Sequence, residues 1–158
     1  MDALGLEPSE RAFLAALQHF GVRYLIIGMS AAVLQGASGV TEVVVELWVE
    51  RLDEPRIGDA ARAANGFWIS EAFGSRPPGL GGPSLSDRFD VVTTAHGLAD
   101  FRTEYAASRI VSLDGIELHV LPLTRILASK RAGNRAKDQA QIPALEAALA
   151  VERDNDRA

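Results

Sequence analysis

The sequence predicts a protein of the mixed α/β class, with helices flanking a mixed β-sheet in a single domain. Helical patterns, with apolar residues three or four positions apart, alternate along the chain with strand patterns. The chain has 158 residues, 47% hydrophobic and 23% charged, which is typical of one globular domain. We expect this domain to span residues 1–151 and a polar, frayed tail to span residues 152–158.

In the first half of the chain, helical and strand patterns follow one another closely. The pattern predicts a helix over residues 8–20, a strand over 24–27, a turn over 28–30, a short helix over 31–34, a strand over 42–50 and a helix over 55–64. Pro8 opens the first helix and Gly21 ends it. The continuous apolar run at 24–27 is typical of a strand that is buried on both faces. In the strand over 42–50, alternation places Glu46 and Trp48 on the same face.

The second half continues the same alternation. The pattern predicts a strand over residues 90–92, a helix over 99–107, strands over 109–113 and 116–121, and helices over 123–131 and 135–151. Asp114-Gly115 predicts a tight hairpin between the last two strands. Pro143 predicts a kink in the last helix. Residues 74–87 form the only long loop, a surface loop or lid, in which we expect Gly79, Gly81 and Gly82 to provide flexibility.

Composition excludes several functional classes. The chain has no cysteine, which excludes disulfides, thiolate metal sites and a cysteine nucleophile. It has no apolar run of about 18 residues and no leader pattern after Met1, so we expect a cytoplasmic protein with no membrane partner. A net charge of −5 argues against nucleic acid as a general ligand but leaves room for a local basic groove.

One constellation of residues is typical of nucleotide chemistry. A strand ends at Gly28, the turn carries Ser30, the next strand carries Glu46, and a later strand carries Asp90. A helix that starts after a Gly-Ser turn offers backbone N–H groups to a triphosphate. Carboxylates at positions i and i+2 of one strand, with a third from a neighbour, can hold two magnesium ions about 3.5–4 Å apart. Such ions align a hydroxyl with the α-phosphate and stabilise the departing pyrophosphate.

This arrangement resembles the nucleotidyltransferase superfamily with the DNA polymerase β fold, and within it the small bacterial branch related to AbiEii toxins and minimal nucleotidyltransferases. The resemblance covers residues 13–149. The matching segments are residues 21–28 (entry into the Gly-Ser turn), 31–36 (the short helix), 41–50 (the metal-binding strand), 88–92 (the third carboxylate) and 127–138 (the terminal basic and acidic helical motif).

The resemblance implies a nucleotidyltransferase-type fold and a set of site residues. The implied catalytic residues are Glu46, Asp90 and Asp138, with magnesium bound by Glu46 and Asp90. The implied nucleotide-binding residues are Gly28, Ser30, Lys130, Arg135 and Lys137.

The metal-binding strand departs from the family pattern, Thr-x-Asp-x-Asp. Aligning on Trp48, the register we prefer, places Val44 at the first aspartate and Glu46 at the second. Aligning on Thr41 replaces both aspartates by valine. Glu42 lies about 13 Å along the strand from Glu46, too far to bridge a metal pair. The remaining carboxylates would bind a single magnesium ion weakly, which predicts a two-metal site that has decayed.

Three hypotheses follow. The favoured one is a nucleotidyltransferase-fold protein that binds a nucleoside triphosphate or a partner protein with little or no transfer. The second is an active, magnesium-dependent nucleotidyltransferase that acts on a small molecule, tRNA or protein. The third is an interaction protein of a toxin–antitoxin or phage-defence pair. Purely structural roles also stay open: Glu46 as a solvent-facing strand residue, Asp90 as a turn residue, Ser30 as a helix cap, and Lys130, Arg135 and Lys137 as a solvated helix face.

Overall fold

A five-stranded mixed sheet lies at the centre of the fold, with strand order β5-β2-β1-β7-β6. The computed structural model describes residues 4–38, 44–69, 79–83 and 85–158. A second, two-stranded sheet is formed by β3 and β4. The predicted class, a mixed sheet flanked by helices, is therefore confirmed.

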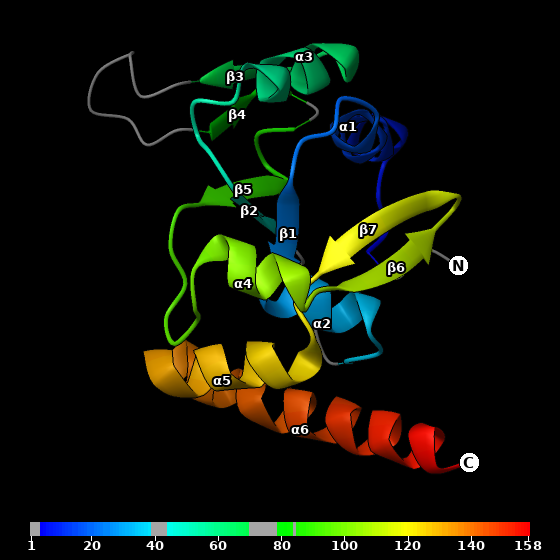
Figure 1. Cartoon of the computed structure of the whole chain (residues 1–158), viewed down its shortest axis with the longest axis vertical. Helices are drawn as coiled ribbons and strands as arrows, with labels where there is room; N and C mark the ends of the chain where they lie inside the picture. Colours follow the sequence, from blue (N-terminus) through cyan, green and yellow to red (C-terminus); the bar gives the residue numbers. More distant parts are fainter. Residues whose placement is uncertain (1–3, 39–43, 70–78, 84) are drawn as a thin grey trace.

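The elements have the following bounds. The strands are β1 Tyr24–Ile27, β2 Val45–Val49, β3 Phe67–Ile69, β4 Gly79–Gly81, β5 Phe89–Val92, β6 Arg109–Leu113 and β7 Ile116–Val120. The helices are α1 Pro8–His19, α2 Gly28–Leu34, α3 Pro55–Ala63, α4 Phe101–Ala106, α5 Leu123–Gly133 and α6 Ala136–Arg157. In Figure 1, α1, α3 and the small sheet lie at the top and the packed pair α5–α6 lies at the bottom, with the large sheet between them. None of the helices described here has the length and apolar character needed to cross a bilayer.

The register of β2 brings distant residues together at one end of the sheet. The strand runs antiparallel to β1, where Glu46 pairs with Ile27, and parallel to β5, where Glu46 pairs with Asp90. Directly paired residues on neighbouring strands point to the same face of a sheet. Glu46 and Asp90 are therefore neighbours on one face, beside the end of β1.

The core forms where apolar stripes meet the buried strands. All four residues of β1 are buried, as expected for a strand covered on both faces. Helix α1 contributes Phe13, Leu14 and Leu17 at helical spacing, and the Phe13 ring meets Phe89 of β5 edge to face at 5.0 Å.

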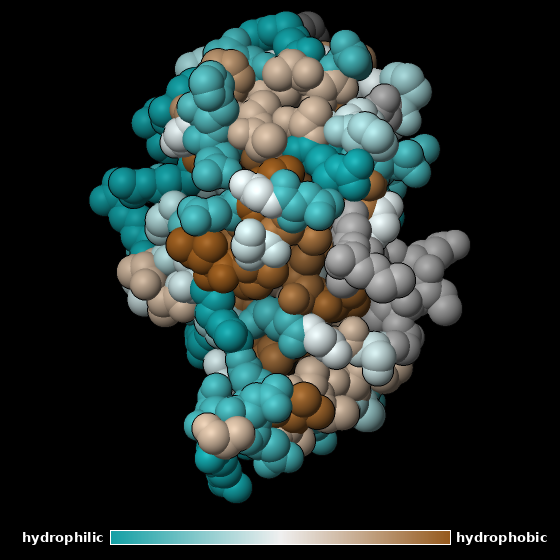
Figure 2. Space-filling model, turned by 90° about the vertical axis from the view of Figure 1, so that its right-hand side faces the viewer, coloured by the Kyte–Doolittle hydropathy of each residue, from teal (hydrophilic) through white to brown (hydrophobic). Residues whose placement is uncertain are grey.

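The hairpin predicted at Asp114-Gly115 is confirmed. Both residues have positive φ, 49° and 82°, the combination that a tight two-residue turn between β6 and β7 requires. Strand β6 is an edge of the large sheet and carries the exposed Ile110, while its Arg109 forms an ion pair with Glu152 of α6. Figure 2 looks onto the side of the molecule that carries this hairpin and shows apolar residues gathered near its middle.

Helix α2 and the end of α6 differ from the prediction. Helix α2 begins at Gly28 itself, with no separate turn before it. Helix α6 continues through Pro143 to Arg157, so the predicted boundary after residue 151 falls inside a helix and the expected frayed tail is wrong for residues 152–157. A proline removes one backbone donor from a helix, and α6 is continuous on both sides of Pro143 despite this loss.

The predicted long loop is shorter than expected. Residues 79–81 form β4, which pairs with β3, so the assignment of Gly79 and Gly81 to flexible loop is wrong. A Cβ on Gly81 would overlap the ring of Phe67, which explains why a residue without a side chain stands there. Residues 74–78 and 84 of the expected loop lie outside the described residues.

A buried ion pair joins α4 to α5. Glu104 is 3% exposed and accepts hydrogen bonds from Arg125 Nε at 2.9 Å and Nη2 at 2.8 Å. It also accepts one from the backbone N–H of Ala99, which anchors the segment that enters α4. The bonds from Arg125 hold the pKa of Glu104 below its usual value. This pair fixes the segment between β5 and α4 against the C-terminal helices.

We predict that Arg125→Gln lowers the free energy of unfolding by about 1–3 kcal/mol, because Glu104 would be left buried without its charge-assisted bonds. Arg131→Gln serves as the matched control, since Arg131 also lies on α5 but pairs with Glu146 of α6 on an exposed surface. That variant should lose less than about 1 kcal/mol. Urea unfolding of both variants measures the difference, and equal losses would contradict the assigned role of Glu104.

Candidate functional site

A cavity of about 300 Å³ opens where the ends of β1, β2 and β5 meet α5 and α6. This volume lies at the lower end of the range for small-molecule sites. It is lined by all the predicted site residues except Ser30, namely Gly28, Glu46, Asp90, Lys130, Arg135, Lys137 and Asp138. The topology thus collects these residues from three strand ends and the C-terminal helices.

Glu46 and Gly28 are in close contact on the strand side of the cavity. A Cβ on Gly28 would lie 2.5–2.9 Å from the carboxylate atoms of Glu46, and Gly28 has a positive φ of 62°. Glycine is therefore required both by the backbone conformation and by the space that the Glu46 carboxylate occupies. Burial is the main cause that raises the pKa of Glu46; Asp90 adds to the rise, and Lys130 opposes it.

Asp138 organises the helix side of the cavity. Its side chain is 1% exposed, and its Oδ2 accepts hydrogen bonds from the Arg135 backbone N–H at 3.1 Å and from Arg135 Nε at 2.9 Å. Its Oδ1 lies 3.2 Å from Arg135 Nη2 and 3.5 Å from Lys130 Nζ. Arg135, followed by the Lys130 charge, lowers the pKa of Asp138 to about 2. A Cβ on Gly133 would lie 2.6 Å from Oδ2, so this glycine makes room for the carboxylate.

Ser30 has a different position from the one expected. It is 1% exposed, its hydroxyl donates to the carbonyl of Ile27 at 2.9 Å, and it accepts from the backbone N–H of Glu46 at 3.3 Å. Because Ile27 is the N-cap residue of α2, Ser30 is also not the helix cap. The hydroxyl therefore links the first turn of α2 to β2 and positions the backbone of Glu46. It does not line the cavity in which a phosphate would bind.

The segment between β5 and α4 adds side chains that the sequence reasoning missed. Thr94, His96 and Leu98 line the cavity. Gly97 has a φ of 70°, and a Cβ there would lie 2.5 Å from that of Ala132, so the segment packs tightly on α5. Their position in the sequence could have indicated this role, because these residues directly follow the strand that carries Asp90.

The carboxylates available in the cavity do not fit a pair of adjacent divalent ions. Glu46 and Asp90 are side by side, but both oxygens of Asp138 are bonded to cationic side chains. In the described ranges, no three histidine, aspartate or glutamate side chains group together in a way that could hold a metal ion. Val44, at the preferred position of the first acid, is 47% exposed and offers no ligand atom. Glu42 lies outside the described residues.

The cavity therefore combines an acidic side, formed by the sheet, with a cationic side, formed by α5 and the start of α6. Such a cavity can bind an anion such as a phosphate on its cationic side. No protein-family model, curated protein or solved structure matches the chain, and the resemblance to nucleotidyltransferases stays a prediction.

We predict that Asp138→Asn lowers the free energy of unfolding by about 1–2 kcal/mol near pH 7, since the variant weakens both the cap of α6 and the bonds to Arg135. The folded-state pKa of Asp138, about 2, lies below that of an unfolded aspartate, about 4. The stabilisation is therefore complete above about pH 4 and is lost as the pH falls towards 2.

Urea unfolding of the wild type and the variant between pH 7 and pH 2.5 measures this dependence. Asp59→Asn, which changes an exposed aspartate paired with Arg62, is the control. The difference in unfolding free energy between this variant and the wild type should not shrink comparably as the pH falls. A difference between wild type and Asp138→Asn that stays constant down to pH 2.5 would contradict the assigned ion pair.

Proposed function

We propose that the protein binds a nucleoside triphosphate in this cavity and transfers nucleotides poorly or not at all, as a nucleotidyltransferase-like protein whose two-metal site has decayed. The observation that carries the proposal is the convergence of Gly28, Glu46, Asp90 and the basic residues of α5 and α6 on a single cavity. These residues are spread over more than 100 positions of the chain.

The basic residues would bind the phosphates. Lys130 is 12% exposed and lies 3.5 Å from Asp138, which restrains an ammonium group that is largely shielded from water. Arg135 is held by the same carboxylate and keeps most of its side chain exposed to the cavity mouth and solvent. Charge-assisted bonds from lysine and arginine to phosphate oxygens are stronger than neutral hydrogen bonds.

The acidic side would support one cation at most. Magnesium prefers six oxygen ligands and keeps several waters, so Glu46 and Asp90 together with phosphate oxygens suit a single, weakly bound ion. In-line transfer between two ions needs a carboxylate that bridges them, and Val44 stands at the preferred position for it. Each 1.4 kcal/mol of lost transition-state stabilisation slows transfer about tenfold, so we expect very slow transfer.

We predict that nucleoside triphosphates raise the melting temperature of the protein in EDTA as well as in magnesium. A ligand at 100 times its Kd stabilises a protein by about 2.7 kcal/mol, which a thermal-shift assay detects. Lys137→Gln should reduce this shift, because Lys137 lines the cavity and is exposed. Arg153→Gln, which changes an exposed cation on the same helix outside the cavity, should leave it unchanged.

Two results would contradict the proposal. A shift that appears only with magnesium, with transfer at rates typical of enzymes that is lost in Glu46→Gln and Asp90→Asn, would identify an active nucleotidyltransferase. If none of the four ribonucleoside triphosphates shifts the melting temperature, nucleotide binding is excluded, and binding of a partner protein is the remaining alternative.

A further inference from the structure

A second charged cavity lies at the opposite end of β2. It has a volume of about 400 Å³, and its charged lining residues are Arg23, Glu50, Arg51, Glu54, Arg56 and Arg102. Glu50 lies four residues after Glu46, so the two cavities are about 13 Å apart along one strand and share no lining residue. The antiparallel pairing of β1 and β2 brings Arg23 next to Glu50, and α4 adds Arg102.

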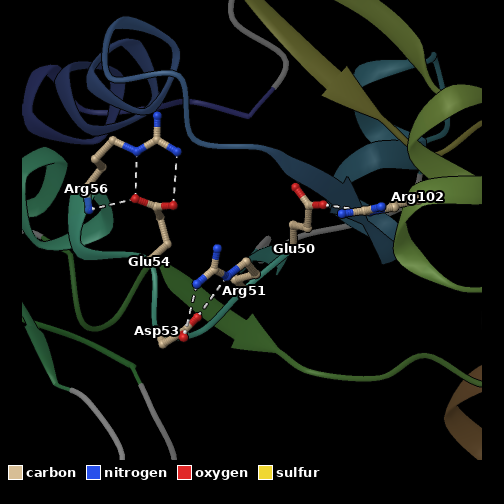
Figure 3. Close-up of polar contacts among 6 residues, drawn as sticks. All are labelled: Glu50, Arg51, Asp53, Glu54, Arg56 and Arg102. Atoms are coloured by element: carbon tan, nitrogen blue, oxygen red, sulfur yellow. Dashed lines mark hydrogen bonds and ion pairs between the residues drawn. The ribbon is translucent and has the colours of Figure 1, made fainter.

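Arg56 and Glu54 form a rigid side of this second cavity (Figure 3). Arg56 Nε and Nη2 bond to the two carboxylate oxygens of Glu54 at 2.6 and 3.0 Å, and Nη1 donates to the carbonyl of Phe20 at 2.9 Å. These bonds lower the pKa of Glu54 to about 2. A Cβ on Gly21 would lie 3.3 Å from Arg56 Nη1, so a small residue there leaves room for the guanidinium. Arg56 is thus engaged by the protein and shapes the cavity.

Arg23 and Arg102, in contrast, share one carboxylate. Glu50 lies 3.6 Å from Arg23 Nη1 and 3.1 Å from Arg102 Nε (Figure 3 draws the latter contact). The Arg102 side chain is 79% exposed, and its hydrogen bond to Glu50 uses Nε rather than either Nη group. One carboxylate balances one guanidinium, so this pair of arginines carries a surplus positive charge.

Arg51 adds a third exposed guanidinium beside this pair. Its Nε and Nη2 bond to the two oxygens of Asp53 at 3.1 and 3.2 Å, so only its Nη1 is left for a ligand, whereas all three nitrogens of Arg56 are bonded within the protein. Counting Asp53, the lining arginines outnumber the neighbouring carboxylates by one, in a chain whose net charge is −5. A local excess of positive charge on an acidic protein attracts anions to that spot.

The arrangement favours a tetrahedral oxyanion over a carboxylate. Arg23, Arg51 and Arg102 approach from three separate elements, at the start of β1, the end of β2 and in α4. A carboxylate has two oxygens in one plane and matches a single guanidinium fork, whereas a phosphate carries up to two charges and three terminal oxygens in different directions. A cavity of about 400 Å³ also admits a small molecule attached to that phosphate.

We propose that this arginine-lined cavity is a second binding site, specific for a small ligand that carries a phosphate group, with the phosphate held by Arg23, Arg51 and Arg102. The site is independent of the proposed nucleotide cavity, because the two share no residue. Glu50 holds Arg23 and Arg102 in position through its ion pairs. Arg56 shapes the cavity without contacting the ligand.

The test is a titration of the ¹⁵N-labelled full chain, followed through the arginine Nε–Hε resonances. The probes are inorganic phosphate and glycerol 3-phosphate, with acetate as the carboxylate control. We expect saturable shifts of the Arg23 and Arg102 signals with both phosphates, and no comparable saturation with acetate. Tighter binding of glycerol 3-phosphate would identify an esterified phosphate as the ligand; tighter binding of inorganic phosphate would identify the free ion.

Variants locate the binding. Arg102→Gln should raise the Kd for phosphate at least tenfold, which is about 1.4 kcal/mol, and Arg23→Gln should act in the same direction. Arg62→Gln, an exposed α3 arginine outside the cavity, and Lys137→Gln, in the other cavity, should leave the Kd unchanged. Acetate binding as tightly as phosphate, no saturable shift at millimolar phosphate, or loss of binding in Lys137→Gln with retention in Arg102→Gln would overturn the proposal.

Discussion

The position of β2 between β1 and β5 is the constraint on which both cavities depend. Its register aligns Glu46 with Ile27 on one side and with Asp90 on the other. A slip of one residue would turn Glu46 towards the core and bring the buried Val45 to the cavity. The buried Val45 and Leu47 oppose such a slip, and so does the Ser30 hydroxyl, which accepts from the backbone N–H of Glu46. The hydrophobic pattern of one strand thus determines where the acidic side chains lie.

The charges at the first cavity are arranged by one further carboxylate. Asp138 is buried at the start of α6, where its carboxylate forms ion pairs with Arg135 and Lys130 and thereby restrains both cations. An acid engaged in this way orients cations instead of binding a metal ion. This engagement supports the proposal of a decayed two-metal site, although acidic side chains are present on both sides of the cavity. In the proposed function, a phosphate would meet these restrained cations, while Glu46 and Asp90 lie side by side on the sheet.

Much of the fold could be predicted from local patterns. The buried run of β1 and the Asp114-Gly115 hairpin depend on neighbouring residues alone, and both were predicted correctly. Strand β4 was missed because a glycine-rich segment carries no strand pattern; it is defined by its pairing with β3, where Gly81 lies opposite Phe67. The end of α6 was misplaced because the polarity of residues 152–158 suggested fraying where the helix in fact continues.

The candidate site was predictable in its residue types but not in its contacts. Resemblance to a family pointed to Glu46, Asp90 and the basic residues of the C-terminal helices. The burial of Ser30 depends on a partner 16 residues away, and the contact of Asp138 with Lys130 depends on how α6 packs on α5, so neither follows from residue spacing; the Arg135–Asp138 bonds, in contrast, have the i,i+3 spacing of a helix cap. The arginine-lined cavity was invisible for the same reason, because Arg23, Arg51 and Arg102 are scattered in the sequence and meet only through the fold.

The central claim, that the first cavity has too few free carboxylates for two adjacent divalent ions, is tested most directly by electron paramagnetic resonance of Mn²⁺. The protein is titrated with Mn²⁺ in the presence of a non-hydrolysable nucleoside triphosphate. The account predicts the spectrum of isolated ions, with at most one Mn²⁺ per chain at the site. A spin-coupled spectrum from two ions about 3.5–4 Å apart would contradict it.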